Sequence, residues 1–261
     1  MDIGILYICT GKYKIFWNRF YQSCEEKFLK NHRKHYFVFT DATDLTYGDN
    51  VTVISESSKG FPMDSLLRFK MFDSISDQLA KFDYLFFFNS NMFINKEINE
   101  DILPTGEEEL IGLIHPGYFN TNYKFFPYER NPKSTAFIPY KSGATYDYFM
   151  GSLNGGKGNA YLKLIKTLND NVNKDLDSNF IALYHDESHL NRYYHFAKVK
   201  KLEPSYGFPE DSSIPYDQKI IILDKIKHGG GYFDKLPKKS IMARLKVKLR
   251  SIKNAIIWKS Y

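Results

Sequence analysis

The chain has 261 residues, enough for one large α/β domain with a substantial core, and it is unusually aromatic, with 22 Phe and 20 Tyr. Its net charge is +6, but residues 235–261 carry nine Lys or Arg and no acidic residue, which leaves 27 basic against 30 acidic residues elsewhere, a net charge of −3. This distribution argues against a general nucleic-acid-binding role for the body of the protein.

The first third of the sequence alternates apolar runs with segments of helical spacing. The runs expected to form buried strands are residues 3–10, 35–41, 51–54 and 83–88. Helical spacing covers residues 13–29 and 64–81, with Asp64 the expected N-cap of the second helix. Such alternation predicts a nucleotide-binding α/β half, whose ligands bind beyond the carboxyl ends of the strands.

The rest of the chain is looser and rich in Gly, Tyr and Pro, which favours a second lobe. We predict one catalytic domain over residues 1–234, with a nucleotide-binding half at about 1–92 and an acceptor half at 93–234, followed by a tail at 235–261. Cys9 and Cys24 lack metal-ligand spacing and are expected to be reduced core thiols. Without a signal-peptide pattern or a long apolar run, the protein is expected in the cytoplasm.

Asn89, Ser90 and Asn91 follow the fourth apolar run. Many nucleotide-sugar enzymes place two aspartates there to hold Mn²⁺ or Mg²⁺ against a diphosphate, and neutral amides are poor ligands for such hard cations. An ordinary turn at the end of a strand would have the same sequence.

Residues 185–191, His-Asp-Glu-Ser-His-Leu-Asn, hold two adjacent carboxylates flanked by histidines. One carboxylate can bind sugar hydroxyls while its neighbour stabilises an oxocarbenium-like transition state. His185 and His189, four residues apart, are also possible metal ligands, and a solvated charged loop is an open alternative.

The sequence has two glycine-rich segments, residues 151–158 and residues 228–231. Residues 151–158 lack the register of a phosphate-binding loop, so we expect close backbone approach to a ligand or a sharp turn there. Residues 228–231, His-Gly-Gly-Gly, are expected to form a mobile linker or a lid over phosphates.

Together these segments resemble glycosyltransferase family 6, which includes the histo-blood-group A and B transferases and the α1,3-galactosyltransferases. The matching segments, in order, are residues 8–13, 36–41, 115–118, 128–130, 155–156 and 185–191. The resemblance implies a GT-A fold with a Rossmann-like half and a mixed central sheet. It also implies a retaining transfer that forms an α1,3 linkage.

The resemblance assigns most of the donor site by position. The uridine is expected at Ile8, Cys9, Thr10 and Tyr13, and the donor sugar and phosphates at Arg68, Asp186 and the Asn89-Ser90-Asn91 motif. Bacterial members with Asn-x-Asn work without a metal, so we expect no cofactor. Lys225, with Lys227 beside it and Arg68 opposite, then supplies the positive charge that the leaving diphosphate needs.

The same resemblance assigns catalysis and acceptor binding. Glu187 lies beside the anomeric carbon, where it either forms a covalent intermediate or stabilises an ion pair. His115, Glu129 and Tyr184 are expected near the acceptor galactose. The acceptor is expected to be a galactose-terminated, fucosylated glycan like the blood-group-H structure.

Donor choice is expected to depend on Met150, Gly151 and Ser152. Met150 with Ser152 favours UDP-galactose, because a methionine side chain fills the space that an acetamido group needs. UDP-GalNAc is the alternative donor.

The tail supports a hypothesis of another class. Met242, Leu245, Leu249, Ile252 and Ile256 recur at intervals of three and four among basic residues, typical of an amphipathic helix on anionic lipid. The protein is therefore either a membrane-surface or polyanion-binding protein acting through its tail, or a transferase held by that tail at the inner face of the membrane.

Overall fold

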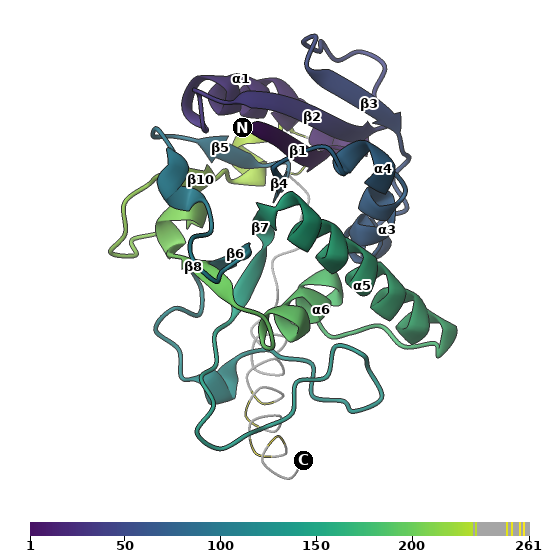
Figure 1. The fold of residues 1–261 in the computed structure, drawn as a ribbon, viewed down its shortest axis with the longest axis vertical. Coiled ribbons are helices and arrows are strands. Elements are labelled where there is room, and N and C mark those ends of the chain that lie inside the picture. Colours follow the sequence, from purple (N-terminus) through teal and green to yellow (C-terminus); the bar gives the residue numbers. More distant parts are fainter. Residues whose placement is uncertain (232, 234–248, 250–251, 253–255, 257, 259–261) are drawn as a thin grey trace.

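The computed structural model describes residues 1–231 together with residues 233, 249, 252, 256 and 258. A seven-stranded mixed sheet runs through the molecule in the order β3-β2-β1-β4-β7-β6-β8, and a small sheet has the order β5-β10-β9 (Figure 1). The strands are β1 Asp2–Ile8, β2 Arg33–Thr40, β3 Val51–Ser55, β4 Tyr84–Phe88, β5 Met92–Ile94, β6 Leu110–Ile114, β7 Phe149–Lys157, β8 Val199–Leu202, β9 Phe208–Pro209 and β10 Ile220–Ile222.

The first four strands are parallel, whereas β7 runs antiparallel to both β4 and β6. The α-helices are α1 Trp17–Lys27, α2 Met63–Leu66, α3 Arg68–Asp73, α4 Ser76–Leu79, α5 Gly158–Asp177, α6 His185–Tyr194 and α7 Lys225–His228. Short 3-10 helices lie at Gly11–Phe16, Glu100–Ile102, Tyr123–Phe125 and Pro204–Gly207. This arrangement confirms the expected α/β fold with a mixed central sheet, as in GT-A glycosyltransferases.

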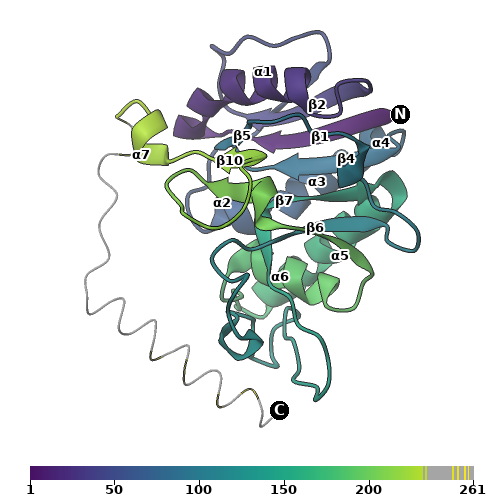
Figure 2. The ribbon, with the colours of Figure 1, turned by 90° about the vertical axis from the view of Figure 1, so that its left-hand side faces the viewer.

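Two cores cover the two faces of the sheet. Along β1, Ile5 and Tyr7 belong to the core that packs on α1, whereas Leu6 belongs to the core that packs on α3, α5 and α6. Ile5, Leu6 and Tyr7 belong to different cores because successive side chains of a strand point to opposite faces of the sheet. Figure 2 shows α1 on one side of β1 and α5 and α6 on the other.

All four expected strands are present, and the first expected helix is present as a 3-10 turn followed by α1. The second is broken into α2, α3 and α4, and the expected N-cap was wrong. Pro62 is the N-cap of α2, and the Asp64 carboxylate instead accepts hydrogen bonds from Ser58 Oγ and the Lys59 amide.

The glycines of β7 serve the packing of the sheet itself. A Cβ on Gly155 would lie 2.4 Å from the Leu85 carbonyl oxygen, and one on Gly156 would lie 2.3 Å from the Glu109 carbonyl oxygen. The close approach expected over residues 151–158 is therefore, at these two positions, an approach to neighbouring strands rather than to a ligand.

The segment between β6 and β7, residues 115–148, forms the loops at the end of the molecule away from β1–β3 (Figure 1). Cys9 and Cys24 are free, buried thiols. Among the described residues, no helix is both long and apolar enough to cross a membrane. The proposed boundary at residue 234 and most of the amphipathic tail lie outside the described residues and stay predictions.

Candidate active site

A cavity of about 520 Å³ opens beyond the carboxyl ends of β1 and β4, on the side toward which β1 runs in Figure 2. We call it the donor cavity. The expected donor residues that line it are Ile8, Thr10, Tyr13, Arg68, Asn89, Ser90 and Lys225. These residues come from both ends of the described chain, so residues that are far apart in the sequence lie together in the folded protein.

The lining of the donor cavity is positively charged. Lys12, Arg68 and Lys225 line it with a single carboxylate, that of Asp64. The Lys225 ammonium lies 3.2 Å from the Tyr13 hydroxyl and 4.8 Å from the centre of its ring. Cations held over aromatic rings and next to hydroxyl groups suit the oxygens of a diphosphate.

Arg68 connects the donor cavity to the two adjacent carboxylates. Its Nη1 donates to the Gly151 carbonyl oxygen at 2.8 Å, and its Nε lies 3.1 Å from Asp186 Oδ2. The guanidinium also stacks on Phe87, 4.5 Å from the ring centre. Burial raises the pKa of Asp186, and the charge of Arg68 opposes that rise. The buried pair fixes Asp186 at the inner end of the site.

Glu187 is held by two hydrogen bonds from β7 and the segment before it. Tyr148 donates its hydroxyl to Oε1 at 2.6 Å, and the Gly151 amide donates to Oε2 at 2.8 Å. Burial raises the pKa of Glu187 to about 7, although both hydrogen bonds lower it. The carboxylate is thus oriented, and its ionisation falls in the neutral range, as is common for catalytic carboxyl groups.

Gly151 allows this approach. A Cβ at this position would lie 3.3 Å from Asp186 Oδ2 and 3.5 Å from Glu187 Oε2. A methyl group here would therefore sit tightly against Asp186 and in ordinary van der Waals contact with Glu187.

Residues 185–191 lie within α6, so the alternative of a solvated charged loop was wrong. His185 starts the helix with a φ of 50°, and Asp186, Ser188 and His189 are buried. The Asn191 amide group donates to the carbonyl oxygens of Phe149 and Glu187, and its oxygen accepts from the Phe149 amide. Asn191 thereby fixes α6 against β7.

The two histidines of this segment have different surroundings. His189 is buried, with Nε2 3.7 Å from Asp175 and Nδ1 3.4 Å from Thr135, and burial lowers its pKa to about 4. His185 packs edge-on against Phe61, 5.0 Å between ring centres. In the part of the chain that the structure describes, no three His, Cys, Asp or Glu side chains are grouped to hold a metal ion.

The Asn89-Ser90-Asn91 motif joins three segments. Asn91 Nδ2 donates to the Leu223 carbonyl oxygen at 2.8 Å, and the Leu223 amide donates back to the Asn91 carbonyl oxygen at 2.8 Å. Tyr7 donates its hydroxyl to the Ser90 carbonyl oxygen, and the Asn89 amide donates to the Ser152 carbonyl oxygen. The motif thus positions the strand end beside the segment that leads to Lys225.

The remaining expected donor residues lie outside the lining of the donor cavity. The Cys9 side chain is in the core, and Met150 packs partly buried against the same core. Ser152 is buried, and its Oγ has no hydrogen-bond partner among the described residues. Uridine binding by Cys9 and the roles of Met150 and Ser152 in donor choice stay predictions.

The expected acceptor residues lie on the Glu187 side of α6. Tyr184 immediately precedes the helix and is 41% exposed, and burial together with the nearby Tyr184 raises the pKa of Tyr118 to about 12. His115 packs on Tyr118 and Tyr148, and burial lowers its pKa to about 4.

Glu129 is buried, and both its oxygens are engaged. They accept hydrogen bonds from the backbone amides of Asn131 and Leu183. In this structure Glu129 therefore positions the segment that leads into α6, and direct contact with an acceptor stays a prediction.

Several residues of this site were not predicted from the sequence, among them Tyr148 and Phe61. Tyr148 binds Glu187 across 39 positions, and Phe61, 83% exposed, lines the donor cavity and contacts His185. Nothing in the local pattern around Tyr148 identifies its partner. An aromatic residue between Gly60 and Pro62, in a segment expected to be a turn, is a signal that could have identified Phe61.

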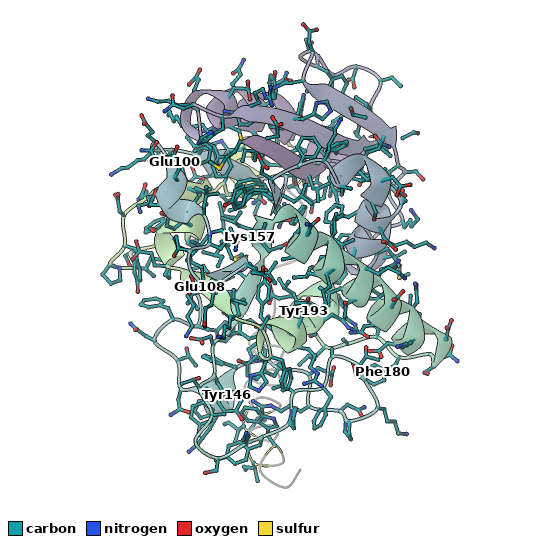
Figure 3. The ribbon with its side chains drawn as sticks, viewed as in Figure 1. Glu100, Glu108, Tyr146, Lys157, Phe180 and Tyr193 are labelled. Atoms are coloured by element: carbon teal, nitrogen blue, oxygen red, sulfur yellow. The ribbon has the colours of Figure 1, made fainter. Side chains whose placement is uncertain are left out.

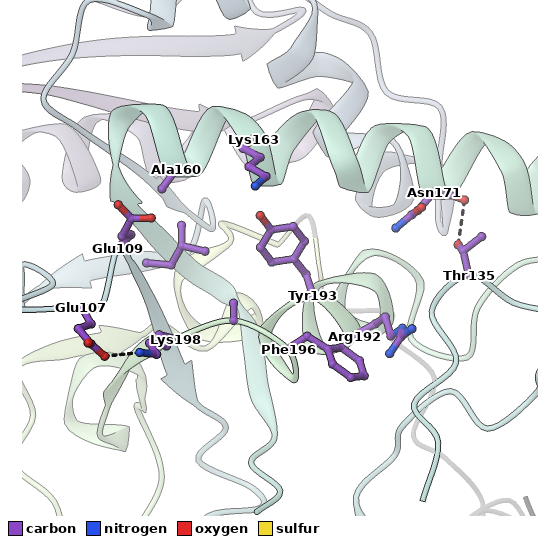
Figure 4. Close-up of a pocket in the computed structure, with 12 residues that line it drawn as sticks. Glu107, Glu109, Thr135, Ala160, Lys163, Asn171, Arg192, Tyr193, Phe196 and Lys198 are labelled. Atoms are coloured by element: carbon purple, nitrogen blue, oxygen red, sulfur yellow. Dashed lines mark hydrogen bonds and ion pairs between the residues drawn. The ribbon is translucent and has the colours of Figure 1, made fainter. Parts of the chain in front are cut away.

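A second cavity, of about 620 Å³, lies between α5 and the C-terminal half of α6 (Figure 4). It is lined by Lys163 from α5 and by Arg192 and Tyr193 from α6, and the Arg192 guanidinium lies 4.1 Å from the centre of the Phe196 ring. None of the expected donor, acceptor or catalytic residues lines this cavity, so it is separate from the site around Glu187.

Comparison with known proteins finds similar sequences over most of this chain. The sequence pattern of glycosyltransferase family 6 matches residues 1–229. The O-antigen biosynthesis glycosyltransferase WbnI of Escherichia coli is 42% identical over 228 residues, which cover 86% of this chain and 95% of that protein. The globoside alpha-1,3-N-acetylgalactosaminyltransferase 1 of Mus musculus is 29% identical over 244 residues, 89% of this chain and 68% of that protein. The histo-blood group ABO system transferase 1 of Rattus norvegicus is 30% identical over 240 residues, 87% of this chain and 65% of that protein.

Proposed function

Because this chain belongs to glycosyltransferase family 6, we propose that it transfers galactose from UDP-galactose to a galactose-terminated, fucosylated glycan. The transfer forms an α1,3 linkage, retains the anomeric configuration and needs no divalent metal. The observation that carries the proposal is the carboxylate of Glu187, oriented by Tyr148 and Gly151 next to the Arg68–Asp186 pair.

In the proposed reaction, the bond between the anomeric carbon and the β-phosphate oxygen breaks, and UDP leaves with the electron pair. Positive charge then develops at the anomeric carbon, and Glu187 stabilises it from the opposite face, through a covalent bond or an ion pair. The acceptor hydroxyl adds on the face that UDP left, and its proton passes to the departing diphosphate.

Metal independence is supported by the charges of the donor cavity. Asn89 and Asn91 bring no negative charge to the strand end, and the Asn91 amide group is bound to Leu223. Lys225 and Arg68 both line the cavity and can neutralise the leaving diphosphate.

The donor is tested by measuring UDP release with UDP-galactose and with UDP-GalNAc, each in the presence of EDTA and of a blood-group-H-type acceptor. We expect faster release with UDP-galactose, and an α-linked product by proton NMR. Preference for UDP-GalNAc, the sugar named in the mouse relative, would support the alternative donor. A β-linked product would contradict the retaining mechanism.

We further propose that the tail holds the enzyme on an anionic membrane surface, which places it at the cytoplasmic face. Leu249, Ile252 and Ile256 are 64%, 41% and 70% exposed, and basic residues alternate with them in the sequence. Exposed apolar groups among cations suit anionic lipid. A binding protein without catalysis would not explain the site around Glu187.

Vesicle flotation with phosphatidylglycerol tests the tail. Replacing Leu249, Ile252 and Ile256 together by serine should release the protein from these vesicles while activity on a soluble acceptor remains. Retention of the triple variant on the vesicles would contradict the membrane proposal and leave the enzymatic one intact.

A further inference from the structure

Trp258 is packed into the body of the protein although it lies beyond the region that matches the family. Its side chain is fully buried, and its indole Nε1 donates to the Ile138 carbonyl oxygen at 2.7 Å. Four tyrosines surround the indole, with ring centres 5.0 to 6.2 Å away: Tyr123, Tyr128, Tyr140 and Tyr146. Tyr146, labelled in Figure 3, marks this cluster among the loops of the acceptor half. We call the cluster the indole socket.

The indole socket is one aromatic contact away from the residue that orients Glu187. Tyr128 packs against Trp258 on one side and against Tyr148 on the other, 5.8 and 5.6 Å between ring centres. Tyr148 then donates to Glu187 at 2.6 Å. Tyr128 also donates its hydroxyl to the Asp147 carbonyl oxygen, so it fixes both the ring and the backbone next to Tyr148.

A second connection runs through Arg130. Its guanidinium lies 4.6 Å from the centre of the Trp258 ring, and its Nη2 donates to the carbonyl oxygens of Lys124 and Phe126. The neighbouring Glu129 carboxylate binds the Leu183 amide just before α6. Burial lowers the pKa of Arg130 to about 10, so the guanidinium is still charged at neutral pH, and the face of the indole stabilises this charge.

From these two connections we propose that Trp258 is a positioning residue of the acceptor side. The inference rests on the proposed function, because it assigns to Trp258 the placement of the Tyr148–Glu187 pair and of the loop before α6 for transfer to a glycan. Trp258 itself contacts neither substrate. Ile256, two residues earlier, is exposed and belongs to the proposed membrane-binding surface. The buried side chain of Trp258 therefore also attaches that surface to the acceptor half.

The two connections make different physical demands on residue 258. The stack on Tyr128 and Arg130 requires an aromatic ring, whereas the bond to Ile138 requires the indole nitrogen. Phenylalanine keeps the ring and loses the donor, and alanine loses both. If Trp258 positions the site by packing, kcat/KM for the acceptor should therefore decrease in steps from tryptophan through phenylalanine to alanine.

The test compares Trp258→Ala and Trp258→Phe with Phe196→Ala, a control that removes an exposed aromatic side chain at the second cavity, away from the site around Glu187. Small misplacements of catalytic groups can lower rates about 100-fold, so we expect kcat/KM for the acceptor to fall about 10- to 100-fold in Trp258→Ala. UDP affinity should be unchanged, since every residue that lines the donor cavity except Lys225 belongs to the nucleotide-binding half. Trp258→Phe should recover much of the activity, and Phe196→Ala should resemble the wild type.

Two further readouts separate positioning from general destabilisation. The acid limb of the pH profile should move to higher pH in Trp258→Ala, because the hydrogen bond from Tyr148 lowers the pKa of Glu187. Hydrogen–deuterium exchange should rise in residues 146–150 and 183–187 but not in β1.

Unchanged acceptor kinetics, or a parallel loss of UDP affinity, would overturn the proposal. If the wild type transfers no sugar, the proposed function fails, and the exchange measurement still decides whether Trp258 anchors these segments.

Discussion

Removing the Tyr148 hydroxyl should shift the pH dependence of the enzyme in a direction that the structure determines. Glu187 has a pKa of about 7 and stabilises positive charge only when it is ionised, so activity should rise as the pH increases through this value. Tyr148 donates to the ionised carboxylate at 2.6 Å and thereby lowers the pKa of Glu187. Burial and the nearby Glu187 raise the pKa of Tyr148 well above its ordinary value, so the phenol stays a donor. Tyr148→Phe should therefore raise the pKa of Glu187.

The size of the shift follows from the strength of the bond. A hydrogen bond to a charged group contributes about 1.5 kcal/mol at the lower end of its range, and one pKa unit corresponds to about 1.4 kcal/mol. We therefore expect the acid limb of kcat/KM for donor hydrolysis, measured from about pH 5 to about pH 9, to move up by about one pH unit.

Tyr194→Phe is the matched control, because it removes a buried hydroxyl of α6 that donates to the Ile111 carbonyl oxygen and not to Glu187. Its pH profile should coincide with that of the wild type. A Tyr148→Phe profile that is unchanged, or that moves to lower pH, would refute this reasoning.

Three other outcomes are expected. Lys225→Ala should lower turnover about 100-fold by removing charge at the leaving diphosphate, whereas Lys227→Ala, whose ammonium pairs with Asp211, should have little effect; equal losses would count against the assignment. Turnover should be insensitive to EDTA and should not increase with Mn²⁺, so a several-fold stimulation would contradict metal independence. Burial raises the pKa of Glu187 in the folded protein above its value in the unfolded chain. The stability that the protonated side chain contributes is therefore fully present below the pKa of the unfolded chain and is lost as the pH rises through about 7. Glu187→Gln should thus raise the free energy of unfolding at pH 8 by about 1 to 3 kcal/mol in a denaturant titration, whereas Asp186→Asn, which leaves Arg68 unpaired, should lower it.

The sequence alone predicted the parts of the site that local pattern encodes. Continuous apolar runs predicted the buried strands, and Asn89 and Ser90, the polar residues after 83–88, line the donor cavity. The rule that ligands bind beyond the carboxyl ends of parallel strands explains why Ile8 and Asn89 lie in one cavity.

The parts that could not be predicted depend on contacts between distant segments. Arg68 meets Asp186 and Gly151 across more than eighty positions, and Tyr148 meets Glu187 across 39. The charged segment at residues 185–191 lies in a helix that Asn191 binds to β7, and no local periodicity reveals these hydrogen bonds. Asp64 did not cap its helix because Ser58 and Lys59 compete for its carboxylate.

The turnover of Glu187→Gln, measured beside its affinity for UDP, tests the central claim most directly. The substitution keeps the size of the side chain and removes the charge that the proposed transition state requires. Loss of such an interaction lowers kcat about 100-fold or more, so we predict a loss of that size. UDP affinity should be preserved, because Ile8, Thr10 and Tyr13 line the donor cavity and Glu187 does not. Transfer at a rate near that of the wild type would show that the carboxylate is structural and would contradict the mechanism.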